Sequence, residues 1–270
     1  MIQPSVTISL LPSNPKAPFL LGPDLAGAVA AAAEIGYPAF ELFPPHLAAI
    51  DVPQLKSLMA THGLRLSTIG TGGGWVTRQW TLIDPDASIR EQAKNYIADV
   101  IRRAAELDAT AIIGSMQGRV GTRNRAECLA MLRDQLGELG AVAEGCGKPL
   151  FYEPLNRYET DLFHTMEETL GFLNDGLPQN LKILADLFHM NIEETCTASA
   201  LRLGGSRIGH VHFVDSNRQV PGRGQTNFGP VAEALRATNY NGYLAVEAFP
   251  LPTPSSAAQQ ALASFRQWFA

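Results

Sequence analysis

The segment that decides the fold is Pro149-Leu150-Phe151-Tyr152-Glu153-Pro154-Leu155-Asn156-Arg157-Tyr158-Glu159-Thr160. Its apolar run 150–152 favours a short buried strand, because aromatic and large apolar side chains fit a pleated surface. Pro154 ends that strand, since proline has no N–H to donate to a neighbouring strand. Glu153 therefore lies where a strand passes into a loop, a position better suited to a functional site than to a core.

Outward from this segment, the pattern of a strand followed by a helix recurs eight times along the chain. The predicted strands are short and apolar rather than alternating, as expected where helices cover a parallel sheet. The predicted strands are 6–11, 39–43, 64–69, 110–114, 150–153, 181–186, 208–213 and 242–247. The predicted helices are 24–35, 52–62, 86–107, 122–145, 164–174, 197–203, 228–238 and 255–269, and the predicted long loops are 12–23 and 70–85.

Eight such units in about 250 residues are typical of a closed barrel. The sequence therefore predicts the α/β class and a single (β/α)8 TIM barrel. Residues 1–270 are predicted to form one domain, because no linker or shift in composition interrupts them. The alternative is a doubly wound open sheet, which often carries a phosphate-binding fingerprint after its first strand, and residues 10–15 have no such fingerprint.

The composition and net charge indicate which classes of binding partner are not expected. The chain is 46% hydrophobic and 17% charged with a formal net charge of −5, so neither nucleic acid nor an anionic membrane is an expected partner. Cys128, Cys146 and Cys196 are an odd number without metal-type spacing, which favours reduced thiols in a cytosolic protein. The N-terminus has no basic region followed by an apolar run, so no signal peptide is predicted and a cytoplasmic location is expected.

Polar side chains mark the ends of four successive predicted strands. These side chains are Glu153, Asp186, His212 and Glu247. Active sites of such barrels lie at the C-terminal ends of the strands, where these groups would meet. Alone, each would more often be a helix cap, an ion-pair partner or a core histidine, but together they favour a metal site. Three oxygens and one nitrogen suit Mn²⁺ most, with Mg²⁺ or Co²⁺ as alternatives and Zn²⁺ still open.

A second group of polar residues follows closely after these strand ends. Glu159, His189 and Arg218 lie in segments that would project over the metal site. A polyhydroxylated substrate needs hydrogen-bond donors and acceptors at such positions. The alternative is that they belong to solvated loops without a role in binding.

Three segments resemble a known family. Residues 153–160, 185–190 and 210–218 are similar to the sugar isomerase/epimerase family with the xylose-isomerase-like TIM barrel, and most similar to its ketose 3-epimerase (D-tagatose/D-psicose 3-epimerase) branch. The resemblance implies a Mn²⁺- or Co²⁺-type ion held by the four strand-end residues. It also implies a small sugar substrate, whose O1–O3 end is held by Glu159, His189 and Arg218, and a homo-oligomer, either a dimer or a tetramer.

The expected activity is that of a metal-dependent sugar epimerase that inverts C3 of a free ketose. Glu153 and Glu247 would be the catalytic residues, exchanging the C3 proton between them through a metal-bound cis-enediolate. Two carboxylates on opposite sides of the sugar are what such an exchange needs.

Other classes share the same metal site. An aldose–ketose (or hydroxypyruvate-type) isomerase would move the proton between C1 and C2, and a dehydratase or 3-keto-glycoside lyase would also begin by removing a proton beside a carbonyl. An abasic-site endonuclease would want more histidine ligands and a basic face than six histidines and a net charge of −5 provide. The non-enzyme alternative is a sugar-binding barrel without turnover.

Overall fold

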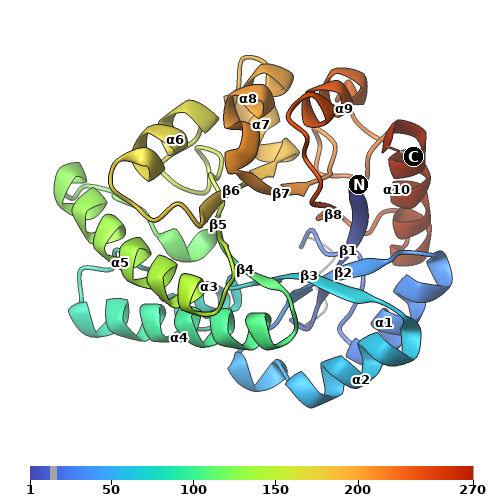
Figure 1. Ribbon diagram of the computed structural model, residues 1–270, viewed down its shortest axis with the longest axis horizontal. Helices are drawn as coiled ribbons and strands as arrows, with labels where there is room; N and C mark the ends of the chain where they lie inside the picture. The colour runs from blue at the N-terminus through green and yellow to red at the C-terminus, as the bar shows by residue number, and fades with distance from the viewer. Residues whose placement is uncertain (13–16, 270) are drawn as a thin grey trace.

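Parallel strands form the centre of the structure, which a computed structural model describes for residues 1–12 and 17–269. In this part of the chain, eight strands pair in sequence order and close into a barrel (Figure 1). Closure joins the first strand to the last, with Gln3 opposite Tyr243 and Val6 opposite Val246. The strands are β1 (Gln3–Ser9), β2 (Ala39–Phe43), β3 (Arg65–Gly70), β4 (Thr110–Ile113), β5 (Leu150–Tyr152), β6 (Leu181–Asp186), β7 (Ile208–His212) and β8 (Tyr243–Val246).

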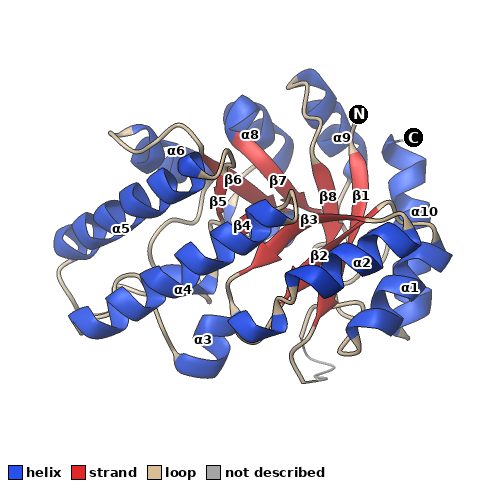
Figure 2. Ribbon diagram, turned by 60° about the horizontal axis from the view of Figure 1, so that its bottom comes forward, coloured by secondary structure: helices blue, strands red, loops and turns tan. Residues whose placement is uncertain are grey.

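Helices surround the barrel and cover its outer face (Figures 1 and 2). Among the described residues, none of the helices has the length and apolar character needed to cross a bilayer. The outer helices are α1 (Leu25–Ile35), α2 (Val52–His62), α4 (Ala87–Glu106), α5 (Arg125–Gly145), α6 (Met166–Asn174), α8 (Thr197–Gly204), α9 (Phe228–Ala237) and α10 (Pro254–Phe269), and α3 (Gly73–Arg78) and α7 (Leu187–Glu193) are two shorter helices.

Apolar side chains fill the space between the strands and the helices. Val29 on α1, Ile97 on α4 and Leu132 on α5 are fully buried, each on the face of its helix that is turned to the barrel. Burying a side chain of this size contributes roughly 1.5–3 kcal/mol to folding. All four residues of β4 are buried as well, which explains why the strands read as apolar runs rather than as alternating patterns. The predicted (β/α)8 barrel is thereby confirmed.

The first strand begins and ends earlier than predicted. It was expected over 6–11 but runs from Gln3 to Ser9, because its first residues pair with β8 across the closure of the barrel. Pro4 argues against a strand in the sequence, since it cannot donate to a ladder. Here it precedes Val6, where pairing with β2 begins, so the missing N–H removes no bond on that side. The proline-rich loop expected over 12–23 includes residues 13–16, which lie outside the described residues.

Two short helices stand outside the helices that the sequence predicted. Helix α3 forms within the glycine-rich segment 70–85, where Gly73 packs so closely that a Cβ would lie 2.1 Å from the carbonyl oxygen of Pro44. Glycine there serves close approach rather than flexibility. Helix α7 begins directly after β6 because the Asp186 carboxylate accepts the Phe188 N–H at 2.7 Å and caps the helix.

Candidate metal and sugar site

The four strand-end residues converge at one end of the barrel. Glu153 follows β5, Asp186 ends β6, His212 ends β7 and Glu247 follows β8. All four are buried, and one ligand atom from each lies within 4.8 Å of the others. Nδ1 of His212 is at the centre, 3.0 Å from Oδ2 of Asp186 and 3.4 Å from Oε1 of Glu153. The structure therefore brings together every residue that the sequence proposed as a metal ligand.

The chemistry of this cluster fits a divalent cation. Three buried carboxylates within such a distance repel one another strongly unless positive charge lies among them. Carboxylate oxygens with one imidazole nitrogen are suitable ligands for Mn²⁺, Mg²⁺ or Co²⁺. The Glu153 carboxylate also needs a glycine beside it, since a Cβ on Gly114 would lie 2.6 Å from its Oε2. The four side chains are thus positioned to hold such an ion.

Two of the predicted sugar-binding residues, His189 and Glu159, lie next to each other, and His189 also lies close to Glu153. Nε2 of His189 is 3.8 Å from Oε1 of Glu153, and Nδ1 of the same ring is 3.8 Å from Oε1 of Glu159. His189 is buried, whereas the Glu159 side chain is 44% exposed and forms the outer edge of the group. Asn156, which the sequence interpretation missed, joins the two. Its Nδ2 lies 2.7 Å from Nδ1 of His189 and donates to Glu159 at 2.9 Å.

Arg218 brings the compensating positive charge. Its guanidinium donates to Oε2 of Glu247 and lies 3.6 Å from Oδ2 of Asp186. The guanidinium carbon is 4.8 Å from the centre of the Phe188 ring, so an aromatic face supports it. The backbone of Arg218 has φ of 58°, a left-handed conformation that is uncommon for a side chain of this size and often marks functional sites.

Burial and charge shift the acidities within the cluster. Burial raises the pKa of Glu247 to about 8, against the opposing charge of Arg218. Burial acts in the same direction on the pKa of Asp186, but the surrounding histidine and arginine side chains hold it well below its usual value. The pKa of His212 is raised well above its ordinary value, because the charges of Glu41 and Glu247 outweigh the lowering effect of burial. The protons that His212 and Glu247 retain thus offset part of the negative charge that a bound cation would offset.

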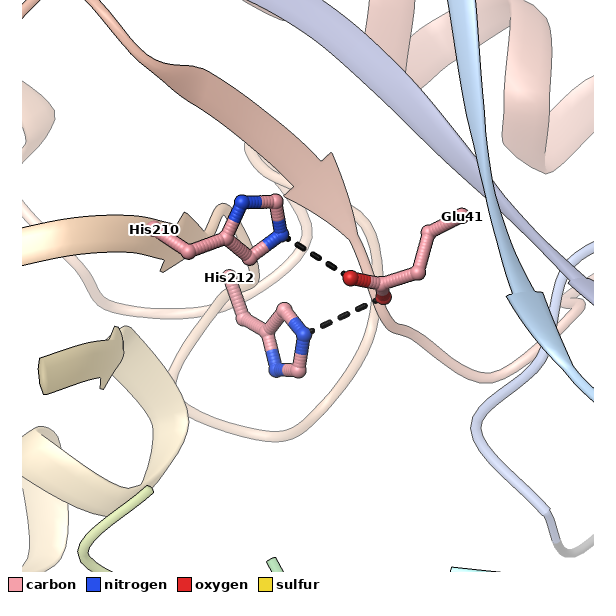
Figure 3. Close-up of side chains that lie close together, drawn as sticks. All are labelled: Glu41, His210 and His212. Atoms are coloured by element: carbon pink, nitrogen blue, oxygen red, sulfur yellow. Dashed lines mark hydrogen bonds and ion pairs between the residues drawn. The ribbon is translucent and has the colours of Figure 1, made fainter. Parts of the chain in front are cut away.

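A further carboxylate next to this cluster was missed by the sequence interpretation. Glu41 on β2 is fully buried, and its carboxylate contacts the imidazoles of His210 and His212 (Figure 3). The sequence placed Glu41 in a strand without giving it a role. A signal was present, because glutamate is almost never fully buried unless it is paired, and this one stands within an apolar strand.

The fold and site define the class of protein. Residues 29–268 match the model of the family described as "Xylose isomerase-like TIM barrel", so the chain belongs to this family, as the three motif segments predicted. Its relatives then narrow the activity, since two named relatives that this chain covers over 75% and 90% of their length are sugar epimerases. The chain is therefore an enzyme, a carbohydrate epimerase or isomerase.

Two relatives and one solved structure illustrate the relationship. The chain is 32% identical to a D-psicose 3-epimerase of Ruminiclostridium cellulolyticum over 80% of this chain and 75% of that protein. It is 29% identical to a 3-dehydro-D-guloside 4-epimerase of Escherichia coli, over 86% of this chain and 90% of that one. Its structure matches that of a D-psicose 3-epimerase with D-tagatose from Clostridium cellulolyticum H10, with a TM-score of 0.78 and 26% identity over 91% and 93% of the two chains.

Binding of a divalent ion is expected to release protons. A carboxylate must be ionised to bind a cation, whereas Glu247, with its pKa at about 8, holds a proton at lower pH in the metal-free protein. His212, whose pKa is also raised, must give up a proton as well, so the affinity for Mn²⁺ should fall by at least about tenfold for each pH unit below 8. Isothermal titration calorimetry in two buffers of different ionisation enthalpy measures this release directly.

The control is Glu168→Gln on α6, where glutamine can take over the role of glutamate in the capping box with Thr165. This variant should bind Mn²⁺ as the unaltered protein does. An affinity that stays constant between pH 6 and 8, with no proton released, would contradict the assignment of Glu247 and His212 as ligands.

Proposed function

We propose that the enzyme inverts C3 of a free ketose, with Glu153 and Glu247 as the two groups that exchange the proton. The observation that carries this proposal is the convergence of both carboxylates on one centre, from strands β5 and β8. Because β6 and β7 stand between these strands in the barrel, the two carboxylates approach that centre from different sides. A substrate lying between them would present one face of C3 to each.

Proton exchange between two carboxylates inverts the carbon. One carboxylate removes the proton from C3, which lies next to the C2 carbonyl, and the negative charge spreads from C3 to the carbonyl oxygen. The other carboxylate returns a proton to the opposite face. A divalent ion held by Glu153, Asp186, His212 and Glu247, with Mn²⁺ as the first choice, supplies Lewis-acid stabilisation of that charge.

The second group of residues would hold the carbonyl end of the sugar. Arg218 and His189 present N–H donors next to the carboxylate cluster, where O1 and O2 of a ketose would lie. Glu159 can accept from a hydroxyl group, and Asn156 keeps its carboxylate in place through the bond to Oε1. These donors would polarise the carbonyl and fix the position of C3 between the two carboxylates.

The test of this function is proton NMR in D₂O with a panel of free ketoses, recorded after the metal-loaded enzyme has been removed. Loss of the C3–H signal together with appearance of the C3 epimer is expected for at least one ketose. Exchange at C1 or C2 alone would instead support an aldose–ketose isomerase. Tight sugar binding without exchange at any carbon would support the non-enzyme alternative, a binding barrel.

Removing one of the two carboxylates should stop the exchange. Glu153→Gln keeps the size of the side chain but cannot accept the proton, so we expect kcat to fall by about 10²–10⁴-fold, the usual worth of a general base. Circular dichroism should show an unchanged fold, and Glu168→Gln is the control with normal kcat. Near-normal turnover by Glu153→Gln would show that this carboxylate is not one of the two bases.

A second candidate is 4-epimerisation of a 3-keto-glycoside. The two reactions have the same chemistry, since each inverts a carbon next to a carbonyl group. The relative from Escherichia coli, a 3-dehydro-D-guloside 4-epimerase, matches this chain over 90% of its own length. Besides this similarity, one feature of the structure favours a substrate larger than a free ketose.

That feature is a cavity of about 410 Å³ beyond Glu159, lined also by Trp75, Gln79, Ser115 and Arg119. A volume in this range can enclose a ligand larger than one sugar. A free ketose ends in a hydroxymethyl group on the Glu159 side of its carbonyl. A 3-keto-glycoside instead continues there through C2 and C1 to a substituent, which the indole and the polar side chains of this cavity could contact.

Trp75→Ala distinguishes the two substrates. If a glycoside substituent lies against the indole, the variant should lose about tenfold in kcat/KM for a 3-keto-glucoside while its activity on a free ketose is unchanged. The measurement is the initial rate with each substrate, and Val76→Ala, a change at an exposed neighbouring residue, is the control. An equal loss of kcat/KM for both substrates would show that the cavity does not select the glycoside.

Assembly as a homodimer or homotetramer and a cytoplasmic location stay predictions. Light scattering after size-exclusion chromatography measures the mass in solution and tests the first of them. A mass of a single chain would contradict it.

A further inference from the structure

Glu41 is a carboxylate enclosed within the barrel. It lies on β2, has no exposed surface, and reaches His212 on β7, which is 171 residues away in the sequence. In the closed barrel, β1 and β8 separate these two strands, so the contact crosses the interior (Figure 3). A buried charge of this kind is costly unless neighbouring groups compensate it, so its presence needs a physical explanation.

Both oxygens of the Glu41 carboxylate have polar partners. Oε1 lies 3.2 Å from Nε2 of His212, and Oε2 lies 2.9 Å from Nε2 of His210. The hydroxyl group of Thr68 on β3 also donates to Oε2. The carboxylate is therefore held from several sides and cannot turn freely.

The contact with Glu41 determines which nitrogen of His212 is free. Nε2 faces Glu41, so Nδ1 faces the other side of the ring, where it is 3.0 Å from Asp186, 3.4 Å from Glu153 and 3.6 Å from Glu247. A histidine can bind a metal through either nitrogen, and the hydrogen bond made by the other nitrogen selects between them.

We propose that Glu41 is a positioning residue for the metal centre. It accepts the Nε2–H of His212, which holds the ring in this orientation and leaves the lone pair of Nδ1 directed at the ion. The negative charge of the carboxylate also makes the imidazole a stronger donor to a cation. Glu41 has no exposed surface and would contact neither sugar nor ion. The proposal rests on the candidate metal centre, and it is independent of which sugar the enzyme converts.

The competing interpretation is a second metal site made of Glu41, His210 and His212, since these three residues also form a buried group. The hydrogen bonds argue against it. The Thr68 hydroxyl donates to the same oxygen that faces His210, so part of the acceptor capacity of this oxygen is already used within the protein. The second site would also compete with the first for His212. Metal stoichiometry separates the two interpretations.

Glu41→Gln is the main test. The amide keeps the size of the side chain but removes the charge and weakens the acceptor for Nε2–H. We expect the dissociation constant for Mn²⁺, measured by electron paramagnetic resonance of the free ion, to rise by about 10–100-fold. Saturating Mn²⁺ should restore most of kcat with KM for the sugar little changed, because Glu41 acts through the ion's ligand.

Two further variants serve as controls. Thr68→Val leaves the charge of Glu41 in place but removes one donor, so a smaller loss of Mn²⁺ affinity is expected, and it keeps the proposal testable if Glu41→Gln does not fold. Glu168→Gln should bind Mn²⁺ with unaltered affinity. A folded Glu41→Gln protein with normal Mn²⁺ affinity would overturn the proposal, as would an unaltered protein that binds no ion.

Nitrogen-15 NMR of histidine-labelled protein tests the ring directly. With diamagnetic Mg²⁺ or Zn²⁺, His212 should carry its proton on Nε2, and its Nδ1 signal should shift when the ion is added. A shift of Nε2 instead would show that the ring binds the ion through the nitrogen that faces Glu41. Two ions per chain, reduced to one in Glu41→Gln, would establish the second metal site and overturn the positioning role.

Discussion

The concentration of buried negative charge at one end of the barrel is the constraint on which the site depends. Glu153, Asp186 and Glu247 place three carboxylates within 4.8 Å of one imidazole, and Glu41 adds a fourth carboxylate on its far side. Because these groups are buried, water does not screen their repulsion effectively. Within the protein, the balance comes from Arg218 and His212. Burial nevertheless keeps the pKa of Glu247 above its usual value, although the charges of Arg218 and His212 both lower it.

The barrel makes this concentration of charge attainable. Parallel strands all end at the same side, so four side chains that are far apart in the sequence meet without any long loop to position them. The strands are rigid because both of their faces are packed, as the fully buried β4 shows. A rigid scaffold of this kind can hold like charges together that a flexible loop would let separate.

The sequence predicted the parts of the structure that depend on local pattern. Strand 39–43, strand 181–186 and helix 52–62 have the bounds that were expected, because each is a short apolar or amphipathic run bounded by glycine, proline or a polar cap. The convergence of the four candidate ligands also followed, since it needs only the position of each at a strand end. The start of strand β1 was predicted too late, because Pro4 is unfavourable in a strand unless the closure of the barrel is known.

The parts that could not be predicted depend on contacts between distant segments. The partner of Glu41 is 171 residues away, and nothing in residues 39–43 indicates that β2 faces β7 across the interior. Asn156 likewise joins His189 to Glu159 only after the loop following β5 has folded over the site. Helix α3 was not predicted because it lies in a glycine run, in which Gly73 serves close packing against Pro44 rather than flexibility.

The division between strands and loops also explains why the reaction type is easier to infer than the substrate. Both candidate functions invert a carbon beside a carbonyl group, and the groups proposed for that chemistry come from the ends of β5 to β8. The cavity beyond Glu159 is instead built from loops and short helices after β3 and β4, with Trp75 and Ser115 in its wall. The segments after β3 and β4 can change without disturbing the charge balance at the strand ends, which involves Arg218 after β7. It follows that one catalytic centre can be kept while the surrounding loops select either a free ketose or a glycoside.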